Sequence, residues 1–244
     1  MINLPKIIEL DEYLDLTEFK SISQEFKENL SDVEHWSNIG VFSPDEKLEE
    51  PEGAKTLSLR IYKDISNITN WAAIDKHDLW KDGPVYQSTF PKIYQFVNNL
   101  PFKNVARVFL SYTKDKTEIL PHAAFTPEIQ EPWRQEFLWF SLLGDKKMWV
   151  SDWDSTLEYY NNGFVIKDKF PMEYSNGVSC WFNPIMLHGI KNGDDFSASL
   201  RIDGEFTEEF REKLFGDTKW KTTFNWVDER HLLPEDSRYL EHEK

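Results

Sequence analysis

Two histidines and one arginine are spaced along a β-rich stretch so that they could form a metal site beside an anion-binding group. His122 ends the segment 117–122 (TEILPH), and His188 lies in 186–193 (MLHGIKNG). Imidazole suits transition metals such as iron, zinc and copper, so two imidazoles that meet in the folded chain can hold such an ion. Arg201, in SLRID, lies on the last strand-like run, where an inward guanidinium is costly unless it meets an anion such as a carboxylate.

The joint pattern, and not any single residue, singles out these positions. A lone histidine on a strand is usually structural, and a lone arginine usually lies on the surface. We assign no metal role to the four other histidines, which are His35, His77, His231 and His242. Ser199 precedes Arg201 by two residues and therefore shares its face of the strand.

Short β-rich runs separated by turn signals fill the chain between 105 and 206. The runs are 105–112, 117–122, 136–143, 146–153, 163–168, 177–184, 186–193 and 197–206. Hairpin turns are expected at Asp145, at 161–163 and at 175–177. The pattern predicts a sandwich or small barrel. In an eight-stranded jelly roll the second and seventh strands are neighbours, so His122 and His188 are expected to meet at its mouth.

Apolar residues spaced three and four apart predict a helix within 11–36, with Asp15 or Thr17 as its cap. Residues 89–100 predict a second helix with a proline in its first turn, and 207–216 predict a third that ends at Gly216. Between them, 43–55 is expected to be an exposed loop and 56–62 a strand.

The chain of 244 residues is therefore expected to be one domain, mainly β with flanking helices. Residues 1–100 would form an N-terminal helical support, 101–206 the β core, and 207–244 a C-terminal helix and an aromatic tail. Three aromatics of that tail need something to pack against, either as a lid over the barrel or, in our preferred interpretation, as a satellite core; they are Trp220, Phe224 and Trp226.

Composition limits the partners of the chain. The net charge is −15 at pH 7 and the pI about 4.9, so nucleic acid and anionic membranes are poor partners. The single cysteine, Cys180, excludes an internal disulfide. The N-terminal residues do not read as a signal peptide, and no apolar run is long enough to span a membrane. We therefore expect a cytoplasmic protein.

Two segments of the chain resemble a known family. Residues 90–124 (FPKIYQFVNNLPFKNVARVFLSYTKDKTEILPHAA) and 177–206 (GVSCWFNPIMLHGIKNGDDFSASLRIDGEF) are similar to the two halves of aspartyl/asparaginyl β-hydroxylase-like and free-amino-acid hydroxylases. These belong to the iron(II)/2-oxoglutarate dioxygenase superfamily, and the resemblance covers about half of the chain.

The resemblance implies a double-stranded β-helix (jelly-roll, cupin-like) core that uses iron(II), 2-oxoglutarate and O2. It implies that His122 and His188 bind the iron. It also implies that Arg201 binds the distal carboxylate of 2-oxoglutarate, helped by Ser199 or Tyr112. Asn183 and Asn192 could support the histidines, although a turn role is the better interpretation for both.

The sequence departs from the family pattern where an acid usually follows the first histidine, because Ala124 stands there. Water could fill the vacant ligand position, as in two-histidine hydroxylases. Chloride could fill it instead, as in the radical halogenases of this superfamily. A different acid could supply the ligand, and the candidates are Glu128, Asp152 and Asp154. A second departure is Trp139, where family members often carry histidine or arginine.

The resemblance favours an oxygenase that hydroxylates an unactivated C–H bond of an amino acid or peptide side chain, with a halogenase as the next alternative. A non-redox cupin-like binding protein, a zinc site and an inactive pseudoenzyme remain open. Arg60, Arg107 and Arg134 could reach a substrate carboxylate, although a surface position is the expected one for each.

Overall fold

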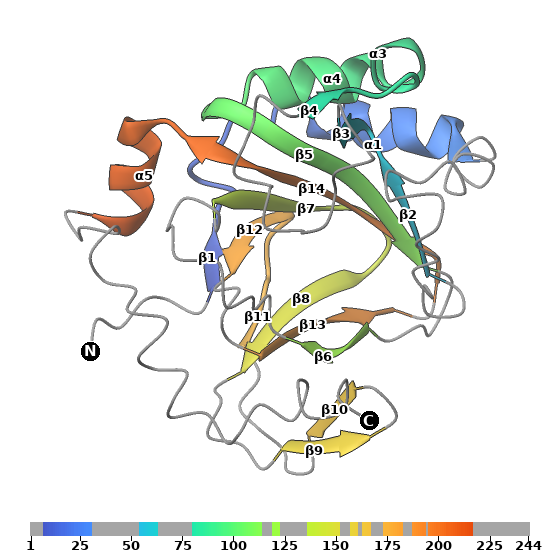
Figure 1. Ribbon diagram of the computed structural model, residues 1–244, viewed down its shortest axis with the longest axis vertical. Helices are drawn as coiled ribbons and strands as arrows, with labels where there is room; N and C mark the ends of the chain where they lie inside the picture. Colours follow the sequence, from blue (N-terminus) through green and yellow to red (C-terminus); the bar gives the residue numbers. More distant parts are fainter. Residues whose placement is uncertain are drawn as a thin grey trace.

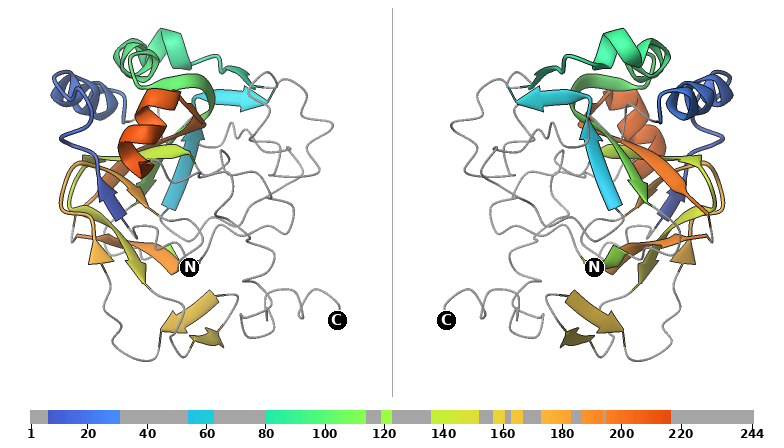
Figure 2. Two further views of the ribbon diagram at one scale, coloured as in Figure 1. Left: turned by 90° about the vertical axis from the view of Figure 1, so that its left-hand side faces the viewer. Right: turned by 90° about the vertical axis from the view of Figure 1, so that its right-hand side faces the viewer.

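The computed structural model describes residues 7–30, 54–62, 80–113, 119–122, 136–151, 157–160, 163–166, 173–182, 187–193 and 195–216. Within these ranges the chain forms two facing sheets with helices on one side, as Figure 1 shows. In Figure 2 the helices α1, α3 and α4 lie at one end of the molecule and the β9–β10 hairpin lies at the other.

The larger sheet has six antiparallel strands in the order β1-β12-β7-β14-β5-β2. Their bounds are β1 Ile7–Glu9, β12 Ser179–Phe182, β7 Phe137–Leu143, β14 Ser197–Phe206, β5 Phe102–Thr113 and β2 Ala54–Ser58. The strands β14 and β5 are the longest and run side by side over their whole length. This sheet is therefore the main scaffold of the fold.

The smaller sheet has four antiparallel strands in the order β11-β8-β13-β6. Their bounds are β11 Glu173–Tyr174, β8 Lys146–Ser151, β13 Leu187–Asn192 and β6 Ile119–His122. Two separate pairs complete the strands: β9 Leu157–Tyr160 with β10 Gly163–Ile166, and β3 Arg60–Tyr62 with β4 Trp80–Asp82.

The strand order defines a double-stranded β-helix, which confirms the predicted fold class. Four strands of the barrel (β5, β7, β12 and β14) lie in the main sheet, and the other four (β6, β8, β11 and β13) lie in the smaller sheet. The chain crosses from one sheet to the other between β5 and β6, β6 and β7, β7 and β8, β11 and β12, β12 and β13, and β13 and β14. This is the winding of a jelly roll, in which two antiparallel sheets enclose an interior.

Several local predictions needed correction. The turns at Asp145 and at 175–177 are not hairpins, because each joins strands of different sheets: β7 to β8 in the first case and β11 to β12 in the second. The carboxylates of Glu9 and Asp11 accept the backbone N–H groups of the second turn at 2.7–3.0 Å. The expected strand at 56–62 is two strands, β2 and β3. The sequence analysis also missed β1, which pairs with β12 and is tied to the turn at 175–177 through Glu9.

Four helices lie within the described residues: α1 Phe19–Glu28, α3 Tyr86–Thr89, α4 Pro91–Asn98 and α5 Glu208–Phe215. The predicted caps of α1 are wrong, because Asp15 accepts hydrogen bonds from Thr17 and Glu18 precedes the helix. The first turn of α4 is capped from outside, since Glu25 of α1 accepts the N–H groups of Lys92 and Ile93 at 2.9 and 2.8 Å. This contact ties the two helices together.

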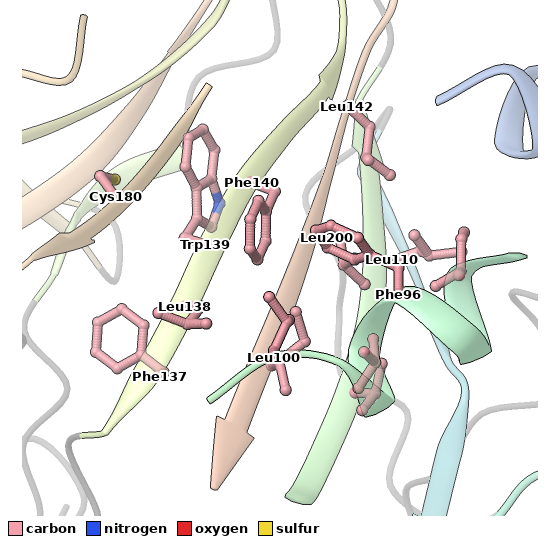
Figure 3. Close-up of a cluster of buried hydrophobic side chains, with 14 of the residues drawn as sticks. Phe96, Leu100, Leu110, Phe137, Leu138, Trp139, Phe140, Leu142, Cys180 and Leu200 are labelled. Carbon is pink, nitrogen blue, oxygen red and sulfur yellow. The ribbon is translucent and has the colours of Figure 1, made fainter. Parts of the chain in front are cut away.

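The helices α1 and α4 cover one face of the main sheet. The ring of Phe140 on β7 meets Phe19 of α1 at 6.1 Å and Phe96 of α4 at 5.3 Å between centroids. Figure 3 shows Phe96 of α4 and Leu100, which follows that helix, beside side chains of the sheet such as Leu110 and Leu200. Because side chains alternate along a strand, residues one position away from these point into the barrel instead.

A buried carboxylate joins α5 to the main sheet. Glu136, which precedes β7, is fully buried and accepts hydrogen bonds from Arg211 Nε, Arg211 Nη2 and the backbone N–H of Phe206. Burial raises the pKa of Glu136, and the hydrogen bonds from Arg211 and Phe206 oppose that rise. The hydrogen bonds from Arg211 and Phe206 therefore favour the ionised form of the Glu136 carboxylate.

Replacing Glu136 by Gln is expected to lower the free energy of unfolding by about 1–3 kcal/mol, because a charge-assisted hydrogen-bond pair is lost in a buried place. Denaturant unfolding followed by tryptophan fluorescence measures this. The control is Glu209→Gln on the exposed side of α5, expected to change stability by less than about 0.5 kcal/mol. Equal changes in the free energy of unfolding for the two variants would show that the hydrogen bonds of Glu136 do not stabilise the fold.

No helix among the described residues is long and apolar enough to cross a membrane.

Candidate active site in the barrel interior

The two predicted metal ligands lie opposite each other on neighbouring strands. In the antiparallel pair β13–β6, residue His188 is the register partner of His122. Opposite residues of an antiparallel pair have Cα atoms about 4.5–5.5 Å apart. The prediction that these strands are neighbours, and that the two histidines meet, is confirmed at the level of the backbone.

The side chain of His188 faces the interior of the barrel. It is only 2% exposed, and its ring lies 4.7 Å from the ring of Phe182 on β12 of the opposite sheet. On the neighbouring strand β8, the register partner of His188 is the apolar residue Val150. The imidazole therefore lies in an apolar and largely dry place, where a metal ligand is protected from competing water.

Arg201 also points into the barrel, on the same level. Its neighbours across the sheet are Trp139 of β7 and Phe109 of β5. The guanidinium lies 4.1 Å from the ring centroid of Phe137 and 5.8 Å from that of Phe182. Arg201 and His188 thus contact the same phenylalanine ring, Phe182, from the two sheets.

The guanidinium of Arg201 is already paired with a carboxylate of its own strand. Arg201 Nε and Nη2 donate to Asp203 Oδ1 at 3.0 and 2.8 Å, and Arg107 Nε donates to Asp203 Oδ2 at 2.8 Å. Burial by itself would raise the pKa of Asp203, but the two guanidinium groups outweigh it and the pKa is lowered. Asp203 is therefore an anion shared by two buried cations.

The residues expected to help Arg201 are divided between the two faces of the sheet. Ser199 is 2% exposed and lies on the interior face, opposite Ser111 of β5 and Ser141 of β7. Tyr112 is the partner of Ala198, so it lies on the alternate face, with Leu110 and Leu200. The structure brings Ser199 and Arg201 together, and it does not bring Tyr112 to them.

A buried lysine that sequence reasoning missed lies on the same interior face. Lys146, the first residue of β8, is 3% exposed, and its Nζ has no hydrogen-bond partner among the residues that the structure describes. It alternates in phase with Met148 and Val150, which belong to the core. Burial lowers the pKa of Lys146 to about 7. The described residues therefore supply no hydrogen-bond acceptor for this buried amine.

Both missed residues left a signal in the sequence. In KKMWV, the period of two places Lys146 on the same face as Met148 and Val150. A lysine is rarely buried on such an apolar face. In SLRID, the same period places Asp203 on the face of Arg201, which foretells their ion pair.

The other arginines proposed to reach a substrate have structural partners. Arg107 lies on Asp203, and its guanidinium carbon is 4.7 Å from the ring centroid of Phe109. Arg60 donates to the carbonyl oxygens of residues 105, 106 and 80 and forms an ion pair with Asp82 at 3.2 Å. Both therefore hold strands together.

Several predicted residues lie outside the described parts of the chain. They are Ala124, Glu128, Arg134, Asp152, Asp154, Asn183, Trp220, Phe224 and Trp226. For His122 and Asn192 the structure describes the backbone. Over the described ranges, no group of three or more His, Cys, Asp or Glu side chains forms a metal cluster.

Comparison with known proteins gives structural similarity only. No family model and no curated protein matches the chain. A prolyl-4-hydroxylase of Pseudomonas putida has a TM-score of 0.41 at 8% identity, with 83% of this chain and 93% of that chain covered. OsALKBH1 has a TM-score of 0.40 at 12% identity, with 83% and 100% covered.

E. coli ycfD has a TM-score of 0.34 at 12% identity, with 70% of this chain covered. This chain spans 38% of the length of ycfD. All three scores are low, so the assignment of the fold rests on the strand order and register of the two sheets.

Proposed function

We propose that the protein is an iron(II)/2-oxoglutarate-dependent oxygenase that hydroxylates an unactivated C–H bond of an amino acid or a peptide side chain. The observation that carries this proposal is the register pair of His188 and His122 on adjacent strands of a double-stranded β-helix. Two imidazoles at one point of such a barrel provide a metal site that leaves several coordination positions open.

The residues of the interior fit this pair of cofactors. His188 is buried against Phe182, so its ring has one orientation in which to meet a metal ion. The interior also holds a buried ammonium group, Lys146, which lacks a hydrogen-bond partner among the described residues and would be satisfied by a carboxylate. Bound iron(II) with 2-oxoglutarate and O2 would supply the oxidant for attack on a C–H bond.

The protein's own contribution would be to orient these groups and to exclude water. The aromatic side chains Phe137, Trp139 and Phe182 line the interior on the level of His188 and Arg201. Their rings are buried, so they leave little room for bulk water near the metal position. The Arg201–Asp203 ion pair lies in the wall of the interior beside these rings.

A second candidate function is halogenation, which the sequence at Ala124 favours. A methyl side chain leaves a coordination position into which chloride would fit, whereas an aspartate would fill it. The two functions differ only in the atom delivered to the substrate radical, so product analysis separates them.

The test is to incubate the iron-loaded protein with 2-oxoglutarate, O2 and a pool of amino acids and short peptides, with and without chloride. A hydroxylase yields products heavier by one oxygen atom in both conditions, and His188→Ala protein yields none. Products in which chlorine replaces hydrogen would move the assignment to the halogenase. Metal binding without consumption of 2-oxoglutarate would instead indicate a zinc or non-redox cupin-like protein.

For the halogenase, Ala124→Asp is expected to abolish chlorination, because the carboxylate takes the position of the chloride. For the hydroxylase, the same change is expected to keep hydroxylation and to increase iron(II) affinity. Metal titration and product analysis of this one variant therefore check which of the two functions holds.

A further inference from the structure

Among the described residues, three basic side chains face the interior of the barrel, and they differ in their partners. Arg107 and Arg201 share Asp203 as their anion. Lys146 Nζ is buried and has no partner among the described residues. A buried charge without a partner costs several kcal/mol, so a lysine is kept in such a place at the expense of stability. An anionic ligand that pairs with the lysine would offset this cost.

The place of Lys146 in the barrel is fixed by two turns that touch each other. An added Cβ on Gly144, which has φ of 75°, would lie 2.4 Å from the carbonyl oxygen of Phe196 and 2.9 Å from Cβ of Ser197. The N–H of Gly193 donates to the carbonyl oxygen of Asp145 at 2.8 Å. The start of β8 is thereby held beside the start of β14, and Lys146 emerges there.

Small hydroxyl side chains line the main sheet at this end of the interior. Ser197 lies opposite Thr113, with 2.8 Å between their hydroxyl oxygens. The next layer is Ser111, Ser199 and Ser141, abreast on β5, β14 and β7. Ser111 and Ser141 are only half-buried. This layer carries hydroxyl groups where the Arg201 layer carries aromatic rings, and hydroxyl groups can donate hydrogen bonds to a carboxylate.

We propose that Lys146, and not Arg201, binds the distal carboxylate of 2-oxoglutarate, and that this carboxylate is the counter-ion of the buried ammonium group. The inference rests on the proposed function and deepens it. It departs from the expectation, drawn from the resemblance, that the arginine on the closing strand binds this carboxylate.

The spacing along β8 supports this assignment. Val150 lies opposite His188, and Lys146 precedes Val150 by four residues on the same face. At about 3.3 Å per residue, the two levels are about 13 Å apart. The flexible four-carbon stem of lysine, followed by the length of a dicarboxylate, spans such a distance from the strand to a metal at His188. Arg201, by contrast, is already paired with Asp203 on its own strand.

The surroundings of Lys146 predict that its amine takes up a proton when the carboxylate binds. Lys147 and Lys191 alternate to the outer face, where Lys191 lies over the ring of Tyr174. On the interior face of β14 the charged groups are Arg201 and Asp203, which pair with each other. Burial lowers the pKa of Lys146 to about 7, and no described carboxylate contributes to that shift. Arrival of a carboxylate favours the charged form and raises that pKa. Binding should therefore become weaker as the pH rises above 7.

The experiment compares two keto acids on protein loaded with nickel(II) in place of iron(II), so that no turnover occurs. 2-Oxoglutarate and 2-oxobutyrate share the metal-chelating end, and only the first carries a distal carboxylate. The wild type is expected to bind 2-oxoglutarate about 10- to 100-fold more tightly. Lys146→Met should abolish this preference and leave the affinity for 2-oxobutyrate unchanged.

Two matched variants serve as controls. Lys147→Met, the next residue with an outward side chain, is expected to keep the preference, and so is Arg201→Lys, which preserves a cation beside Asp203. Since Lys146→Met removes a buried unpaired charge, it is expected to fold at least as stably as the wild type. Between pH 6 and pH 8 the preference of the wild type should fall about tenfold, whereas that of Lys146→Met should stay flat.

Each outcome is decisive. If Lys146→Met keeps the preference, or if Arg201→Lys loses it, the assignment of Lys146 is overturned while the proposed oxygenase stands. If the wild type prefers 2-oxoglutarate equally at pH 6 and pH 8, the proton uptake is overturned. If the wild type binds neither nickel(II) nor either keto acid, the proposed function itself fails, and this inference fails with it.

Discussion

Replacing His188 by alanine is expected to lower the affinity for iron(II) by more than about 100-fold, because loss of a ligand exceeds the effect of losing a group that only supports one. His188 is the buried member of the pair on β13 and β6, and its ring lies within the apolar interior against Phe182. Equilibrium titration with iron(II) under anaerobic conditions measures the effect. His122→Ala should behave in the same way, since either imidazole alone holds iron(II) weakly.

The control must separate a metal ligand from a packing residue. Phe182→Leu removes the same ring contact without touching an imidazole, and each of the two changes is expected to cost about 0.5–3 kcal/mol of stability. If both histidine variants lose iron(II) and Phe182→Leu retains it, the imidazoles are ligands. If His188→Ala binds iron(II) as the wild type does, His188 is a structural residue of the barrel.

Replacing Asp203 by asparagine is expected to lower the free energy of unfolding by about 3–5 kcal/mol, the largest loss of stability that we predict. Asp203 is 1% exposed and is the anion that neutralises both Arg107 and Arg201. Removing one partner of a buried ion cluster leaves the others uncompensated in a place that water does not reach. Urea or guanidinium unfolding of the two proteins measures the difference.

The matched control for Asp203 lies two residues further along the same strand. Glu205 pairs with Lys103 at 3.0 Å, but the Lys103 side chain is 65% exposed, so Glu205→Gln should cost less than about 1 kcal/mol. A similar loss in both variants would show that burial of the Asp203 cluster has no special effect.

The pH dependence of stability gives an independent check on Asp203. Folding lowers the pKa of this carboxyl group, so its ionised form stabilises the native state above the unfolded-state pKa of about 3.9. The stabilisation is lost as the pH falls through the lower pKa of the folded state. The wild type should therefore lose stability below about pH 4 more steeply than Asp203→Asn does.

The sequence predicted the barrel because its strands are short, rich in β-branched and aromatic residues, and separated by turn residues. All eight of the predicted β-rich runs contain a strand, but the run 163–168 forms β10 of the separate β9–β10 pair, and the barrel strand β11 was not predicted. Pro91 and Gly216 bound helices where proline and glycine are expected to. The meeting of the second and seventh strands followed from the topology of a jelly roll, and the register of His188 with His122 agrees with it.

The sequence could not predict the features that depend on distant partners. β1 has three residues, and it is held by Glu9 and Asp11, whose hydrogen-bond donors are backbone N–H groups more than 160 positions away. The cap of α4 comes from Glu25 of another helix. Local patterns carry no information on such contacts. The pairing of Arg201 with Asp203, by contrast, was within reach, because both residues share one face of one strand.

The central claim is that His122 and His188 hold iron(II) together with 2-oxoglutarate inside the barrel. The most direct test adds iron(II) and 2-oxoglutarate to the metal-free protein without oxygen and records the visible absorption spectrum. We predict a charge-transfer band that requires both additions and is missing from His188→Ala protein; a shift of that band with chloride would favour the halogenase. No band from the folded wild type would mean that the barrel does not carry this chemistry.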